Sequence, residues 1–221
     1  MSSLVNRLLR PVLKSLTPYQ SARRLMSLAS SGESNVDWLN ANESPFEPEL
    51  DVDLNILNRY PDAQPEPLIK AYAEYANLSQ EQVLATRGAD EGIELLIRSF
   101  CRGDGRDSII ICPPTYGMYG ISAKTQGAIS TTVPLLPNWQ LDVPELLPKL
   151  NSCKLIFLCS PNNPTGNGLN KADLRTVLES ARGRCLVVID EAYIEFCPES
   201  TLVSWLEEFN NLVILRTLSK A

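Results

Sequence analysis

Three short segments place reactive side chains directly after apolar runs. Asp190 follows four apolar residues, so little water reaches its carboxylate, which then needs a donor or a cation as partner. Asn163 lies in SPNNPTG (160–166), where two prolines and a glycine predict a rigid turn that displays an amide. Lys220 lies in RTLSK (216–220), which offers two hydroxyls and an amine. Together the segments offer a buried acid, an amide and a nucleophilic amine. Each also has an ordinary explanation: a helix N-cap, a plain β-to-α turn and a solvated surface cation.

Two further segments could face the same molecule. Tyr116 in CPPTYGMY (112–119) would place an aromatic ring after another apolar run, although core packing explains it as well. GADEG (88–92) would open a helix, whose first amides and positive dipole end attract anions and whose glycine lets an anion approach closely. The acids at Asp90 and Glu91 also suit simple helix capping. A phosphate- or nucleotide-binding module that uses only this helix start is therefore an alternative.

These segments follow the strands of a predicted α/β fold. A helical pattern begins near Pro65, and helices then alternate with short strands that are apolar throughout. We expect helices over 90–100, 116–126 and 171–181, the last with Asn170 as N-cap, and strands over 109–112, 154–159, 185–189 and 212–215. Strands that are apolar on both faces predict a three-layer α/β/α sandwich with a mostly parallel sheet. In such sheets ligands bind beyond the carboxyl ends of the strands, which is where the reactive residues lie.

The composition excludes several classes of protein. The 221 residues include no histidine, which rules out Ser–His–Asp and Cys–His catalysis and HExxH metal sites. None of the six cysteines forms a C-x-x-C pair, so zinc-ribbon and thioredoxin-type sites are excluded and no metal site is expected. Cysteines within apolar runs predict buried, reduced thiols in a cytoplasmic protein. No apolar run approaches the roughly 20 residues of a membrane span.

Charge is distributed unevenly along the chain. The net charge is −6, yet residues 1–32 carry five basic residues and no acid. The acidic remainder argues against nucleic acid as a partner. Because Pro11 and Pro18 interrupt any long helix and no continuous apolar stretch follows, we interpret the basic start as a docking arm rather than a targeting sequence. We expect this arm to span residues 1–35 and a large domain to span 36–221.

The candidate residues combine into one chemical requirement. An anion cradle, an aromatic plate, an amide, a phenol at Tyr193, a buried carboxylate and an amine are what pyridoxal phosphate (PLP) needs. The amine would form a Schiff base with the aldehyde, and the carboxylate would keep the pyridine nitrogen protonated. The amide and the phenol would bond the ring oxygen, and the helix start would hold the phosphate.

The same segments resemble a known family. SPNNPTG, DEAYIEF (190–196) and TLSKA (217–221), in this order, are similar to the fold-type I PLP-dependent aminotransferases. The resemblance covers residues 16–221. Five further segments narrow it to the histidinol-phosphate aminotransferases: LTPYQSARR, WLNANESPF, NRYPD, TRGADEGIELLIRSFC and CPPTYGMY.

The resemblance implies roles for individual residues. Lys220 would be the Schiff-base lysine and would move a proton between the substrate Cα and the cofactor C4′. Asp190 would pair with the pyridinium nitrogen, and Tyr116 would stack on the ring. The remaining cofactor contacts would be Asn163 and Tyr193 to the ring oxygen, Ala89, Asp90, Thr217 and Ser219 to the phosphate, and Tyr60 to the phosphate in the neighbouring subunit of a homodimer. Tyr19 and Asn42 would lie near the substrate.

The resemblance also implies the reaction. The family transfers an amino group between L-histidinol phosphate and 2-oxoglutarate, giving imidazole-acetol phosphate and L-glutamate, in L-histidine biosynthesis. Its members continue beyond the lysine with the rest of the large domain, a C-terminal small domain and arginines that bind the cofactor phosphate and the substrate. We therefore expect this chain to be the N-terminal portion of such an enzyme, with its large domain truncated. The alternatives are another amino-acid aminotransferase or a PLP decarboxylase of the same fold, or an inactive fragment.

Overall fold

The computed structural model describes residues 3–16, 42, 46 and 58–220. Of these, residues 3–16, 42 and 88–220 belong to one compact unit, and residues 46 and 58–87 belong to a second. The boundary expected at residue 35 lies outside the described residues, so the division into an arm and a large domain stays a prediction.

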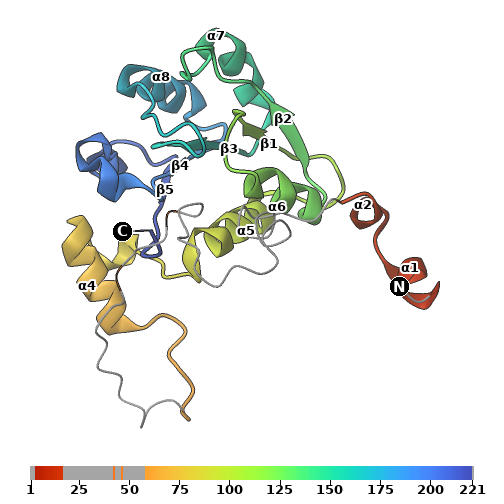
Figure 1. The fold of residues 1–221 in the computed structure, drawn as a ribbon, viewed down its shortest axis with the longest axis horizontal. Coiled ribbons are helices and arrows are strands. Elements are labelled where there is room, and N and C mark those ends of the chain that lie inside the picture. The colour runs from red at the N-terminus through yellow and green to blue at the C-terminus, as the bar shows by residue number, and fades with distance from the viewer. Residues whose placement is uncertain (1–2, 17–41, 43–45, 47–57, 221) are drawn as a thin grey trace, which may run out of the picture. The chain divides into compact units, whose positions relative to one another are not determined.

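The larger unit is built on a parallel sheet of five strands (Figure 1). In spatial order these are β2 (Ile129–Thr132), β1 (Ser108–Ile111), β3 (Leu155–Cys159), β4 (Leu186–Asp190) and β5 (Leu212–Leu215). Every neighbouring pair is parallel. The carboxyl ends of all five strands therefore meet at one edge of the sheet.

Helices cover both faces of this sheet (Figure 1). On one face lie α5 (Gly88–Phe100) and α6 (Met118–Gln126); on the other lie α7 (Val143–Leu146), the 3₁₀ segment Leu147–Ser152 and α8 (Lys171–Ala181). Further 3₁₀ segments span Ile194–Phe196, Pro198–Ser200 and Val203–Glu207. The predicted three-layer fold is confirmed.

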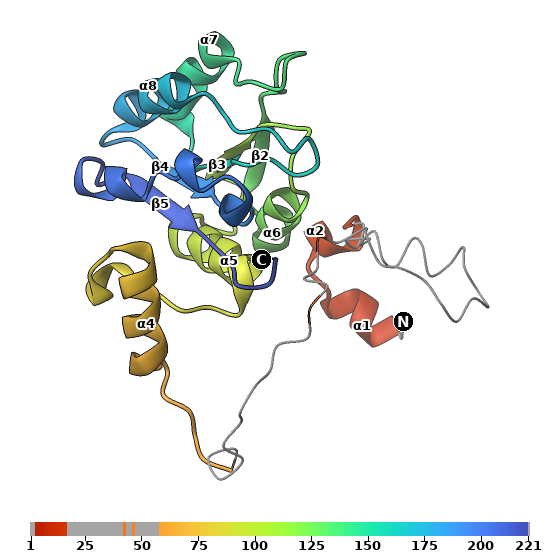
Figure 2. The same ribbon diagram turned by 60° about the vertical axis from the view of Figure 1, so that its left-hand side comes forward.

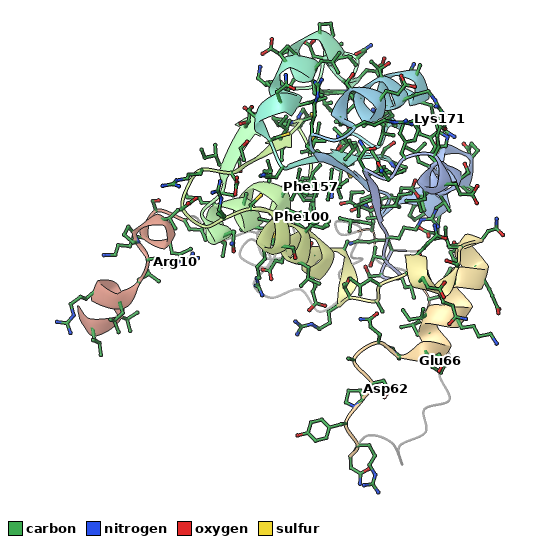
Figure 3. All side chains as sticks on the ribbon, turned by 180° about the vertical axis from the view of Figure 1, so that it is seen from behind. Arg10, Asp62, Glu66, Phe100, Phe157 and Lys171 are labelled. Atoms are coloured by element: carbon green, nitrogen blue, oxygen red, sulfur yellow. The ribbon has the colours of Figure 1, made fainter. Side chains whose placement is uncertain are left out.

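Side chains alternate between the two faces of the central strand β3. Leu155 and Phe157 pack with α5 and α6, whereas Ile156 and Leu158 pack with α8. Figure 3 shows Phe157 within the layer of side chains next to the sheet, with Lys171 at the start of α8. A strand buried on both faces must be apolar at every position, which is why its sequence is a continuous apolar run.

The elements expected from the sequence agree with those observed to within two residues at either end, and 171–181 and 212–215 match at both ends. The Asn170 cap is confirmed, because its side-chain oxygen accepts hydrogen bonds from the Ala172 and Asp173 amides at 2.8 and 3.4 Å. Strand β2 was missed. It is an edge strand of sequence ISTT with mostly exposed side chains, so it has no apolar run to reveal it.

The described N-terminal residues form two short helices, α1 (Ser3–Leu8) and α2 (Pro11–Lys14), with Pro11 beginning the second as its fixed φ favours. Figure 2 shows α2 beside α6. Arg10 donates hydrogen bonds to the carbonyls of Thr125 and Gln126, and Lys124 Nζ donates to the Ser15 carbonyl at 2.8 Å. Arg10 of this segment thus binds the carboxyl end of α6, where the helix dipole favours cations, and Lys124 of α6 binds the segment in return.

The second unit contains α4 (Glu66–Ala76), which buries Ile69, Ala73 and Ala76 and ends at Asn77 in the left-handed conformation. A 3₁₀ turn over Gln80–Gln82 follows, with a capping box that starts at Ser79. The side chain of Gln64 exchanges two hydrogen bonds with the backbone of Ala85, at 2.8 and 2.9 Å. Among the described residues of both units, no helix is both long and apolar enough to cross a membrane.

Candidate active site

The predicted site segments meet at the carboxyl edge of the sheet. Cys159, Asp190 and Leu215 lie side by side in neighbouring strands, in register. Because the strands are parallel, SPNNPTG, the DEAY segment and RTLSK leave the sheet at the same edge. One ligand can contact all three segments only if they leave the sheet at the same edge, and the observed strand order meets this condition.

Asp190 is one of two buried acids at this edge, and Glu191 is the other. Asp190 is 2% exposed, and its side chain accepts hydrogen bonds from the Tyr119 hydroxyl at 2.6 Å and from the Ala192 amide at 3.1 Å. Burial raises the pKa of Asp190; the hydrogen bonds from Tyr119 and Ala192 oppose this, and the nearby acids Asp90 and Glu191 add to it. The sequence prediction of a carboxylate that needs a donor partner is correct.

Tyr119 is the donor that the sequence did not identify. It is fully buried, its ring stacks on Phe157 with centroids 4.9 Å apart, and it meets Tyr116 edge-on at 5.7 Å. Burial, reinforced by the Asp190 charge, places the pKa of Tyr119 well above the ordinary value for a phenol, so Tyr119 is a proton donor at physiological pH. Only its place after Tyr116 in CPPTYGMY could have drawn attention to it.

Two predicted ring contacts touch each other. The Asn163 side-chain amide donates to the Tyr193 hydroxyl at 3.1 Å. Burial raises the pKa of Tyr193, and hydrogen bonds from the side chains of Asn42 and Asn163 lower it. The structure therefore brings a predicted substrate residue, Asn42, to the same phenol. The neighbouring Asn162 is buried and ties two loops together, accepting from Thr115 Oγ1 and donating to the Pro114 carbonyl, both at 2.9 Å.

The start of α5 lies beside the hydroxyls that follow β5. Gly88 has φ +71°, and a Cβ added there would lie 4.0 Å from Thr217 Oγ1. Thr217 Oγ1 and Ser219 Oγ are hydrogen-bonded at 2.8 Å. The first turn of a helix leaves backbone amides without partners inside the helix, so the amides of Ala89 and Asp90, together with the two hydroxyls, suit an anion. Asp90 also accepts a hydrogen bond from the Tyr116 hydroxyl at 3.0 Å.

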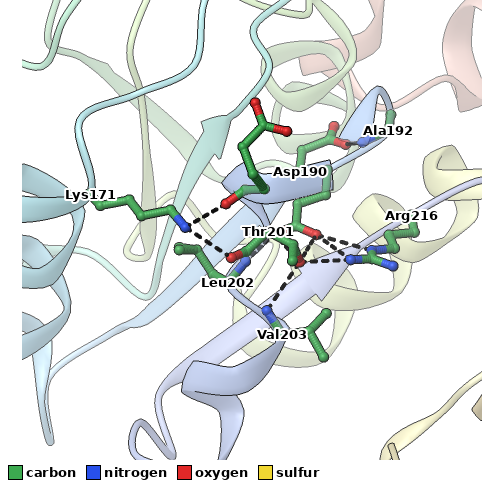
Figure 4. Close-up of polar contacts among 9 residues, drawn as sticks. Lys171, Asp190, Ala192, Thr201, Leu202, Val203 and Arg216 are labelled. Atoms are coloured by element: carbon green, nitrogen blue, oxygen red, sulfur yellow. Dashed lines mark hydrogen bonds and ion pairs between the residues drawn. The ribbon is translucent and has the colours of Figure 1, made fainter. Parts of the chain in front are cut away.

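A buried ion pair connects the ends of β4 and β5 (Figure 4). Arg216 donates to Glu191 Oε2 from Nη2 at 2.8 Å and from Nε at 3.0 Å, and the two side chains are 13% and 1% exposed. Thr201 Oγ1 lies between them: it donates to Glu191 at 2.9 Å and accepts from Arg216 at 2.7 Å. The sequence interpretation gave neither charge a role, although opposite charges directly after two adjacent strands were the available signal.

Three of the predicted site residues are not brought into this group by the described contacts. Lys220 follows β5 at the same edge and is half-buried. Tyr60 belongs to the second unit and is fully exposed there. Tyr19 lies outside the described residues. Their roles stay predictions.

The donor set agrees with the chemistry of PLP. The charged side chains acting on buried Asp190 are two further acids, and none of the ion pairs between described residues includes Asp190. A buried carboxylate in such surroundings suits a cationic ring N–H. The Asn163–Tyr193 pair suits a ring oxygen, and the start of α5 suits a phosphate. Within the described part of the chain, no group of three or more metal-ligating side chains is found.

Comparisons with known proteins agree with this arrangement. Residues 33–221 match the family described as aminotransferase class I and II. The histidinol-phosphate aminotransferase of Cronobacter sakazakii is 56% identical over 98% of this chain and 58% of that protein. The enzyme of the same name from Escherichia coli O45:K1 is 55% identical over 98% of this chain and 59% of that protein. The chain thus spans a little under three-fifths of these relatives.

Solved structures show the same fold. The histidinol-phosphate aminotransferase of Clostridium acetobutylicum aligns with a TM-score of 0.67 and 31% identity over 75% of this chain and 49% of that chain. The enzyme of that name from Sinorhizobium meliloti, solved in complex with pyridoxal-5'-phosphate, aligns with a TM-score of 0.79 over 96% of this chain and 59% of that chain. At 22% identity the second comparison bears on the fold alone.

Proposed function

Since the chain belongs to the class I and II aminotransferases, we propose that its protein uses PLP to transfer an amino group between L-histidinol phosphate and 2-oxoglutarate. The products would be imidazole-acetol phosphate and L-glutamate, in the biosynthesis of L-histidine. The observation that carries the proposal is the position of Asp190, a buried carboxylate whose charged neighbours are acids. It lies at the sheet edge where the Asn163–Tyr193 pair and the start of α5 also lie. The name shared by relatives at 55–56% identity supports the substrate.

The residues of the site divide the work of binding. Asp190 would accept the hydrogen bond of the protonated ring nitrogen, and Asn163 with Tyr193 would hold the ring oxygen. Tyr116 would cover one face of the ring. The phosphate would be held by the Ala89 and Asp90 amides and by the hydroxyls of Thr217 and Ser219. PLP supplies an electron-accepting ring, which stabilises the electron pair left on a substrate carbon when a proton departs.

Lys220 would carry out the proton transfer. Its amine would hold the cofactor covalently at rest, and afterwards would take a proton from the substrate α-carbon and return one to the cofactor side. Asn42, through its bond to Tyr193, and Tyr19 would lie toward the substrate. We further propose a cytoplasmic homodimer in which Tyr60 reaches the partner's phosphate site. The six free cysteines of the chain support the reducing compartment.

The test uses protein expressed from the complete reading frame. Titration with PLP should give a saturable visible absorbance, and borohydride reduction followed by peptide mapping should place the cofactor on Lys220. Lys220→Ala should lose the covalent attachment, while Lys171→Ala, a lysine on α8, should keep it. Failure of the wild-type protein to bind PLP would refute the cofactor assignment.

The substrate is tested separately by comparing amino-transfer rates. We expect histidinol phosphate to be used with a much higher kcat/KM than phenylalanine, with 2-oxoglutarate as the acceptor. A clear preference for phenylalanine would overturn the substrate and leave the cofactor assignment standing.

A further inference from the structure

Tyr119 contacts Asp190 across the interface between α6 and the sheet. Tyr119 lies in the first turn of α6, and Asp190 is the last residue of β4. The hydroxyl donates to Asp190 Oδ2 at 2.6 Å, within the short range of hydrogen bonds to carboxylates. The other oxygen, Oδ1, accepts from the Ala192 amide at 3.1 Å. The two donors thus engage different oxygens and together fix the plane of the carboxylate.

Packing holds the phenol in this position. The Tyr119 ring is fully buried, stacks on Phe157 with an interplanar angle of 15° and meets Tyr116 at 84°. Ala123 on the same helix and Cys159 on β3 belong to the same cluster. The ring cannot leave without opening this core, so the hydroxyl is presented to Asp190 without a large loss of rotational freedom on binding a ligand.

The two charged side chains that act on Asp190 oppose its ionisation. Asp90 on α5 and Glu191, the next residue along the chain, are both acids. Cys159 on β3 is paired in register with Asp190, and the Tyr193 phenol also interacts with Asp190. Of the described side chains around it, Tyr119 is therefore the donor that stabilises an ionised Asp190. A neutral carboxyl group carries no negative charge and so could not form an ion pair with a ring N–H cation.

We propose that Tyr119 is a positioning residue that orients the Asp190 carboxylate and keeps it ionised, so that it can pair with the protonated nitrogen of a bound pyridine ring. The inference rests on the proposed function and deepens it by one residue. Without the hydroxyl, Asp190 keeps one donor among the described residues, the Ala192 amide, so it rotates more freely and takes up a proton at higher pH. The expected consequence is weaker PLP binding and a weaker electron-accepting ring.

The variant that isolates this role is Tyr119→Phe, because it removes one oxygen and preserves the stack on Phe157. A hydrogen bond to a charged group is worth enough to weaken PLP affinity by about ten- to a hundredfold when it is lost. The pH below which bound PLP changes its visible absorbance should also move upward. Amino transfer should lose kcat with little change in KM. Tyr72→Phe, a half-buried tyrosine of α4, is the matched control and should resemble the wild type.

A double-mutant cycle separates this role from a loss of packing. Asp190→Asn removes the charge that Tyr119 serves, so adding Tyr119→Phe to it should change PLP affinity less than about twofold. The melting temperature of the PLP-free proteins, measured in parallel, reports folding without the cofactor. The inference is overturned if Tyr119→Phe binds PLP as the wild type does. It is equally overturned if the effect persists in the Asp190→Asn background. If the wild type itself binds no PLP, the proposed function fails, and this inference fails with it.

Discussion

The buried ion pair between Glu191 and Arg216 offers a quantitative test of how the site edge is held together. The perturbation is Arg216→Met, which keeps the length of the side chain and removes the guanidinium that donates to Glu191 at 2.8 and 3.0 Å. The remaining carboxylate is 1% exposed. Removing one partner of a buried pair typically costs about 3–5 kcal/mol of folding free energy, because a charge stays buried without its counter-charge.

The structure favours the lower end of that range. Glu191 keeps two donors after the substitution, the Thr201 hydroxyl at 2.9 Å and the Leu202 amide at 2.7 Å. We therefore expect Arg216→Met to lower the free energy of unfolding by about 3 kcal/mol. Glu191→Gln keeps an acceptor and leaves an arginine that can reach solvent, so we expect about 2 kcal/mol. The double variant should lose less than the sum, with a coupling of about 1–2 kcal/mol.

The assay is urea unfolding of the PLP-free protein from the complete reading frame, followed by circular dichroism and tryptophan fluorescence. Coincident transitions would justify a two-state free energy. Arg98→Met is the matched control, because Arg98 and Glu94 form an exposed pair at 3.6 Å with side chains 67% and 51% exposed. Its expected effect is about 0.3–0.5 kcal/mol. If Arg216→Met cost no more than Arg98→Met, the pair would not stabilise the fold as reasoned.

Two further predictions concern the scaffold. Asn170→Ala removes the cap of α8 and should lower the free energy of unfolding by about 1 kcal/mol in the same urea assay, whereas Asn170→Asp should not; equal losses would contradict the capping role. The Arg102 side chain and backbone amide hold the pKa of Asp107 well below its ordinary value. The ionised Asp107 therefore contributes to stability above about pH 4, and this contribution is lost as the pH falls through the depressed pKa. The stability difference between wild type and Asp107→Asn should therefore be constant from pH 7 to 5 and shrink in acid, and a difference that grew in acid would reverse the sign of this argument.

Local sequence patterns determined the elements and the place of the site. The apolar runs of β3 and β4 predicted strands buried on both faces, and Asn170 predicted where α8 begins. Parallel strands expose their carboxyl ends at one edge, so Asn163 and Asp190 could be assigned to one site from the order of the segments alone. These features depend on residues that are close in the sequence. Each leaves its own periodicity or spacing, and for that reason they were predictable.

Contacts between distant residues were decided only by the tertiary structure. Tyr119 is 71 residues from Asp190, and Arg216 is 25 residues from Glu191. A burial pattern says that a tyrosine faces the core, but which carboxylate its hydroxyl reaches depends on how α6 packs on the sheet. The edge strand β2 escaped prediction for a related reason, since its place is set by pairing with β1 and not by an apolar run. The sequence therefore determined which groups are available at the site edge, and the packing of the layers decided which of them act together.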